Sequence, residues 1–185
     1  MRLRIRYNAP VVLTFSLAAT VVTLLGSRVV HSMFVVPGQM AWTDPLAYLR
    51  LFSHVLGHAS FQHLLANLTI ILLIGPLLED KYGSADLAIM VALTALVTGV
   101  LNIALFNTGL LGASGVAFMM ILLGSLINFR KGELPLTFVL VVCLFVGQEL
   151  LAMFGRRDGI SQFAHLLGGA CGAAFGFAGS RAKNA

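Results

Sequence analysis

Long apolar runs separated by short polar stretches dominate this chain. An apolar helix of about 20 residues can cross a bilayer, because it rises about 1.5 Å per residue and the hydrocarbon core is about 30 Å thick. The pattern predicts an all-α fold, a polytopic membrane bundle of six transmembrane helices that forms one domain over residues 1–185. The expected spans cover residues 10–27, 61–78, 85–105, 114–128, 136–154 and 162–179.

The segment 31–56 differs from the spans because prolines and polar residues interrupt it. Pro37 and Pro45 break the apolar pattern, whereas Trp42 and Tyr48 are amphipathic aromatics of the kind that settle at a membrane interface. We expect an interfacial loop that lies partly in the outer leaflet.

Composition supports the membrane class and argues against nucleic acid as a partner. Hydrophobic residues make up 58% of the chain and charged residues 10%, and the mean hydropathy is +0.94, which excludes an ordinary soluble domain. The net charge of +5 comes from basic residues that flank apolar runs, so membrane topology explains it. The basic N-terminus resembles a secretory signal, but its apolar run is long and lacks a clear cleavage site, so we interpret it as a retained first span.

The lysines and arginines also predict an orientation. With the N-terminus in the cytoplasm, eight of the 12 basic residues fall inside and four outside, which satisfies the positive-inside rule. The inside set is Arg2, Arg4, Arg6, Lys81, Arg130, Lys131, Arg181 and Lys183. The outside set is Arg28, Arg50, Arg156 and Arg157. Both termini are then cytoplasmic, and the small size without an organelle signal favours a bacterial inner membrane.

The first candidate functional motif is Gly112-Ala113-Ser114-Gly115, which begins the apolar run 116–127. This run predicts a helix of only about 15 residues, too short to cross a bilayer, so Ser114 is expected below the membrane surface. Irregular backbone at that depth survives only where it is buried in protein or lines a water-filled cavity. The alternative is that Ser114 is simply the N-cap of the helix.

The predicted orientation brings polar residues from three spans to the outer side. Ser114 begins the fourth span, and His165 lies near the outer end of the sixth. The outer beginning of the second span carries His58, His63 and Asn67. Ionisable and amide groups within a membrane are costly, so they are functional candidates by default.

A stripe of small residues indicates how two of these spans touch. Gly168, Gly172 and Gly176 follow His165 at intervals that keep them on the same helix face. Such stripes let two membrane helices approach closely, and Gly115 makes the fourth span the natural partner. A stripe that only packs helices would look the same, although it would not explain the histidine.

Serine and histidine at one depth indicate nucleophilic catalysis, in which His165 takes the proton of Ser114 and passes it to the leaving amine. His63 and Asn67 are four residues apart, so both leave one helix face and can donate to the same oxyanion. The backbone amide of Ser114 adds an unpaired donor at a helix start. Alternatively, the His63 and Asn67 pair only forms hydrogen bonds between helices.

Two further interpretations concern carboxylates and metals. Glu149, beside Gln148 in the fifth span, is the nearest carboxylate to His165, and we interpret it as a water-facing or structural group, which leaves a dyad. A zinc site built from the histidines is the competing chemistry. No His-Glu-x-x-His motif accompanies them, so we expect no metal and no cofactor. The histidines concerned are His54, His58, His63 and His165.

Taken together, these motifs resemble the rhomboid family of intramembrane serine proteases in its minimal six-span form. The matching residues run from about Tyr48 to Gly176 and comprise Tyr48-Leu49-Arg50, then His54-x-x-x-His58-x-x-x-x-His63-x-x-x-Asn67, then Glu79 with Gly83-Ser84, then Gly112-x-Ser114-Gly115, and Ala164-His165-x-x-Gly168-x-x-x-Gly172.

The resemblance implies roles for these residues. Ser114 would be the nucleophile and His165 its base. The oxyanion hole would consist of His63, Asn67 and the amide of Ser114. The supporting residues would be His58 for structure or hydration, Arg50 and Glu79 for loop ordering or helix anchoring, and Gly112, Gly115, Gly168 and Gly172. Substrates in this family are transmembrane protein segments, which are cleaved near the outer face and enter from the bilayer past the fifth span.

Two functions from other classes stay open. A non-catalytic rhomboid-like protein could bind transmembrane segments as a chaperone or retention factor, although such relatives generally lack one member of the dyad. A small transporter is disfavoured because no inverted repeat is visible.

Overall fold

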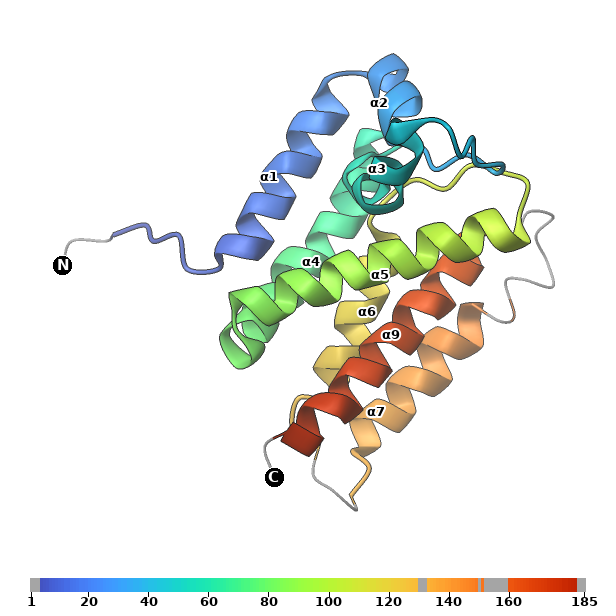
Figure 1. Ribbon diagram of the computed structural model, residues 1–185. Coiled ribbons are helices and arrows are strands. Elements are labelled where there is room, and N and C mark those ends of the chain that lie inside the picture. Colours follow the sequence, from blue (N-terminus) through green and yellow to red (C-terminus); the bar gives the residue numbers. More distant parts are fainter. Residues whose placement is uncertain (1–3, 130–132, 150, 152–159, 183–185) are drawn as a thin grey trace.

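The computed structural model describes residues 4–129, 133–149, 151 and 160–182 (Figure 1). Within these ranges every regular element is helical apart from one isolated antiparallel bridge, which confirms the all-α prediction there. In chain order the elements are α1 (Pro10–Leu24), α2 (Ser27–Phe34), α3 (Pro45–Ser53), the 3₁₀ turn η1 (His54–Leu56), α4 (Phe61–Tyr82), α5 (Ser84–Leu105), α6 (Ser114–Ser125), α7 (Leu136–Val141), the π-helical turn η2 (Val142–Val146) and α9 (Ile160–Ala182).

Among the described residues, α4 and α5 are each long and apolar enough to cross a membrane. The bent pair of α1 and α2 makes a third span if it is counted as one. The helix α6 and the helical stretch Leu136–Glu149 are apolar but shorter. The chain is therefore a multi-pass membrane protein. The end of the predicted span 136–154 and the flanking Arg156 and Arg157 lie outside the described residues, as do Arg130 and Lys131.

The N-terminal helix ends earlier than the predicted span 10–27. Gly26 has a φ of 92°, a value that glycine adopts without steric cost, and α2 follows at an angle of 118° to α1. The predicted loop 31–56 also holds more structure than expected, because it contains α3 and η1. Its extended part is tied down by paired backbone hydrogen bonds of 3.0 Å between Val36 and Leu110, just before α6.

Glu79, near the end of α4, joins α4 to α1 and α5 through hydrogen bonds. Its carboxylate accepts hydrogen bonds from the amides of Val11 and Val12 at 2.9 and 3.0 Å, and from the Ser84 hydroxyl at 2.7 Å. The two amides belong to the first turn of α1, where no intrahelical acceptor exists. Glu79 therefore anchors α1 to the junction between α4 and α5.

The centre of the molecule is α6, which lies between α4 and α9, with α1 and α7 towards opposite edges of the view (Figure 1). This helix is apolar on every side, and such a helix is stable when protein surrounds it. Its buried residues are Gly115, Val116, Ala117, Met119, Met120, Ile121, Leu122 and Leu123. The core therefore forms around the helix that Ser114 begins.

Candidate active site

Ser114 is the first residue of α6, and its helix does not use it as a cap. Ala113 occupies the N-cap position, and no side chain makes a capping hydrogen bond there. The interpretation of Ser114 as an N-cap is therefore wrong. The amide of Ser114 lies in the first helical turn, where backbone N–H groups lack intrahelical acceptors and the helix dipole is positive.

The turn before Ser114 is held by the segment between α3 and α4. Gly112 has a φ of 116°, and its amide donates to the carbonyl oxygen of His54 at 3.1 Å. The amide of Ala113 donates to Nε2 of His58 at 3.4 Å. A Cβ at Gly112 would lie 2.6 Å from Cε1 of His63, so only glycine leaves room for that ring. The turn therefore contacts His54 and His58 of this segment, and His63 of α4.

His54 and His58 are buried and neutral. Burial lowers the pKa of His54 to about 4, and burial together with the charge of nearby His63 lowers the pKa of His58 to about 4. Nδ1 of His58 lies 3.3 Å from the carbonyl oxygen of Leu56, so it carries the proton, and Nε2 can then accept from Ala113. His58 thus links the turn before Ser114 to the backbone of Leu56 through hydrogen bonds.

Two glycines of α9 bring it into backbone contact with α6. A Cβ at Gly168 would lie 2.0 Å from the carbonyl oxygen of Gly115, and a Cβ at Gly172 would lie 2.2 Å from that of Met119. Neither position has room for a side chain. Because Gly115 is adjacent to Ser114, this contact sets His165, three residues before Gly168, near the beginning of α6.

Phe118 fixes the side of α6 on which His165 lies. The two rings are stacked, with centroids 4.3 Å apart and planes 6° from parallel. Phe118 follows Ser114 by four residues, so both side chains leave the same face of α6. The imidazole of His165 therefore contacts a residue on the same face of α6 as Ser114. Phe118 was not singled out from the sequence, although its position four residues after Ser114 places both residues on one helix face.

His63 and Asn67 extend the site from α4. The ring centroids of His63 and His58 are 5.1 Å apart. Asn67 is only 5% exposed, and its Nδ2 has no hydrogen-bond partner among the described residues. A buried donor without a partner is rare in folded proteins and needs an explanation. An acceptor that forms only during a reaction is one such explanation.

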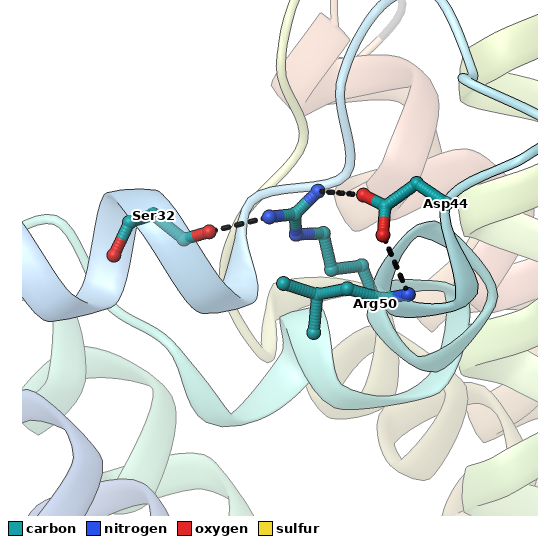
Figure 2. A network of polar contacts seen from close by, with 4 residues as sticks. Ser32, Asp44 and Arg50 are labelled. Atoms are coloured by element: carbon teal, nitrogen blue, oxygen red, sulfur yellow. Dashed lines mark hydrogen bonds and ion pairs between the residues drawn. The ribbon is translucent and has the colours of Figure 1, made fainter.

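Arg50 does not belong to this group of residues; it joins α2 to the segment before α3. Figure 2 shows its guanidinium between two groups: it donates to the carbonyl oxygen of Ser32 and lies 3.5 Å from a carboxylate oxygen of Asp44. Asp44 in turn accepts from the amide of Leu46 at 2.9 Å as the N-cap of α3. Arg50 therefore connects α2 to the beginning of α3.

A carboxylate contacts His165, which the sequence did not predict. Oε1 of Glu149 lies 3.1 Å from Nδ1 of His165, and the two side chains are 17% and 16% exposed. Glu149 thus faces the histidine and not open water. Gln148, its neighbour, is exposed. Among the residues described here, no three His, Cys, Asp or Glu side chains are grouped to hold a metal ion.

Comparisons with known proteins agree with these motifs. Residues 45–182 match the family model of the rhomboid domain. The chain is also 25% identical over 138 residues to a rhomboid protease, GlpG, from Haemophilus influenzae, an alignment that covers 72% of this chain and 71% of that protein. The family match spans most of the chain, including every candidate site residue above, and we conclude that this protein belongs to the rhomboid family.

Proposed function

We propose that this protein is an intramembrane serine endopeptidase that cleaves transmembrane segments near the outer face of the membrane. The observation that carries the proposal is the stack of His165 on Phe118, a residue on the same face of α6 as Ser114. The relative from Haemophilus influenzae is a protease by name, which supports the same conclusion.

The proposed reaction uses the two residues as nucleophile and base. Oγ of Ser114 attacks the substrate carbonyl while His165 takes the hydroxyl proton, and the protonated His165 then donates it to the leaving amine. A water molecule then attacks the carbonyl of the acyl-enzyme while His165 takes its proton. His165 returns this proton to Oγ of Ser114, and the carboxylic acid product leaves. The breaking of the peptide bond thus needs no metal and no cofactor.

The oxyanion would be stabilised by donors from two helices. The unpartnered Nδ2 of Asn67 and the ring of His63 approach from α4, and the amide of Ser114 comes from α6. Donors held in place before the reaction stabilise the developing negative charge without having to reorganise. This role accounts for the orphaned amide of Asn67.

Labelling with a fluorophosphonate probe tests the assignment. We expect the purified protein to be labelled, and Ser114→Ala and His165→Ala to lose the label. Ser125→Ala is the control, because Ser125 lies at the far end of the same helix and donates to the carbonyl oxygen of Leu122 at 2.7 Å. Absence of label on the parent protein, or equal labelling of Ser114→Ala, would contradict the proposal and favour a non-catalytic binding protein.

We also propose six spans with both termini in the cytoplasm of a bacterial inner membrane, as one domain over residues 1–185. The distribution of lysines and arginines supports this orientation. Reaction of single cysteines with a membrane-impermeant reagent would test it, after replacement of the two native cysteines. Outside labelling of a cysteine near either terminus would exclude this topology.

A further inference from the structure

The side chain of Glu149 is an exception on its own helix. The segments α7 and η2 contain no buried residue, and most of their apolar side chains face outward. Glu149 lies one turn beyond them, yet only 17% of its side chain is exposed. A carboxylate withdrawn from solvent in an apolar helix is costly unless it has a partner. Its partner is Nδ1 of His165, at 3.1 Å.

A second contact comes from the same face of this helix. Phe145 precedes Glu149 by four residues, and its ring meets that of Phe118 edge to face, with centroids 6.1 Å apart. Phe118 is the residue stacked on His165. The imidazole therefore contacts Phe118 across its plane and lies within ion-pair distance of Glu149 at Nδ1, and Phe145 contacts Phe118.

The helix that carries Glu149 is also irregular in the turn before this residue. The π-helical turn Val142–Val146 lies just before Glu149. A π-helical turn rotates the residues after it relative to a regular α-helix, and such turns occur frequently at functional sites. The irregularity and the contact with His165 thus occur within two turns of each other.

We propose that Glu149 is a positioning residue for His165, the base of the proposed Ser114 and His165 dyad. This inference rests on the proposed protease function. The carboxylate keeps the imidazole proton on Nδ1, which assigns Nε2 to the serine proton, and it stabilises the imidazolium that forms. The proton moves from Oγ of Ser114 to Nε2 of His165 and then to the leaving amine, so Glu149 is not on the path of the proton.

The kinetic test compares four variants with the parent: Glu149→Gln, Glu149→Ala, Glu149→Asp and the control Gln148→Ala. For Glu149→Gln we expect kcat on a single-span substrate to fall about tenfold to a hundredfold, because loss of an orienting carboxylate impairs general-base catalysis. KM should stay within about twofold, since Glu149 does not contact substrate in this scheme. Glu149→Ala should lose less than Glu149→Gln, whose amide can donate to Nδ1 and favour the wrong tautomer. Glu149→Asp should recover part of the rate, and Gln148→Ala should match the parent.

A spectroscopic readout makes this test independent of the proposed function. Nitrogen NMR of the parent, with His165 assigned by its absence in His165→Ala, should show the Nδ1–H tautomer. Glu149→Gln should shift that signal towards Nε2–H. An active parent whose kcat and tautomer are unchanged in Glu149→Gln would overturn the positioning role and leave the protease intact. An inactive parent that still shows the tautomer shift would overturn the protease and retain the contact. A raised KM or lowered thermal stability at constant kcat would reduce Glu149 to a structural anchor.

Discussion

Two helices pack beside α6 in opposite ways. On one side, α9 approaches so closely that the backbones of Gly168 and Gly115 are in contact. By contrast, α7 and η2 bury none of their residues, and a methyl group placed on Gly147, just beyond them, would have no neighbour within 4 Å. Both helices nevertheless contact Phe118 of α6: His165 of α9 stacks on its ring, and Phe145 of η2 meets the ring edge to face. Glu149, just beyond η2, contacts His165.

This difference in packing indicates that α9 holds the site rigidly, whereas the helix that carries Glu149 contributes a contact without fixing the scaffold. The contact between α6 and α9 leaves no room for movement, because close-packed backbones cannot slide without breaking many contacts at once. The helix that carries Glu149 has few such contacts, so the carboxylate can contribute without fixing the scaffold. We therefore expect substitutions between α6 and α9 to be severe and most substitutions on α7 and its continuation to be mild.

The most damaging substitution should be Gly168→Ala. Its Cβ would lie 2.0 Å from the Gly115 carbonyl oxygen, so the helices must separate by more than about 1 Å, and a misplacement of that size costs on the order of a hundredfold in rate. Overpacking should also lower the free energy of unfolding by about 1–3 kcal/mol. Substrate cleavage and unfolding in detergent measure the two effects.

Gly169→Ala is the matched control for this prediction. A Cβ there would lie 3.4 Å from a side-chain atom of Leu122, which is ordinary contact. Both substitutions add the same methyl group to the same helix, so only the neighbour differs. Equal activity of the two variants would show that the site does not depend on the close approach of Gly168 to Gly115.

Asn67→Ala should lower kcat about a hundredfold, the usual cost of removing one oxyanion donor. KM should change little, because the donor acts on charge that develops only in the transition state. Steady-state kinetics would separate the two constants. Thr69→Ala serves as the control, since Thr69 is exposed on the same helix and donates to the carbonyl oxygen of Leu65. A higher KM with unchanged kcat would move Asn67 from the oxyanion to substrate binding.

Phe118→Ala should reduce kcat by up to about tenfold, because an aromatic stack contributes about 0.5–1.5 kcal/mol. The rate of fluorophosphonate labelling should fall by the same factor, since His165 activates Ser114 in both reactions. Phe118→Tyr retains the ring and should stay near the parent rate. Full activity of the alanine variant would mean that Glu149 alone suffices to hold the imidazole.

Gly147→Ala should have the smallest effect. With open space around the position, activity should stay within about twofold of the parent. Helix propensity should raise the free energy of unfolding by up to about 1 kcal/mol. Thermal unfolding measures the second effect. A large loss of activity here would show that this part of the helix is packed as tightly in the membrane as α9.

Hydropathy predicted the helices well where membrane insertion alone decides them. The bounds of α5 agree with the predicted span 85–105 to within one residue, and the shortness of α6 was visible in its apolar run. The bend at Gly26 and the helix α3 were missed, because both depend on local backbone geometry within a stretch of mixed polarity. Membership of the rhomboid family is confirmed by the family model that matches residues 45–182.

The contacts around His165 show where sequence reasoning ended. Glu149 was interpreted as water-facing or structural, because no spacing rule relates a residue of the fifth span to one of the sixth. Phe118 looked like one more apolar residue of α6. Both contacts depend on the rotation of one helix about its axis relative to another, which hydropathy does not encode.

By itself, the sequence determined which segments are apolar, which polar groups lie near the ends of these segments, and which glycines allow close approach. These follow from solvation and residue size, which are local properties. Only the tertiary structure decided that Ala113 and not Ser114 caps α6, that Asn67 is left with an unpaired donor among the described residues, and that Glu149 reaches His165. Each of these depends on how the chain folds around the site, and the packing of the whole bundle determines those distances.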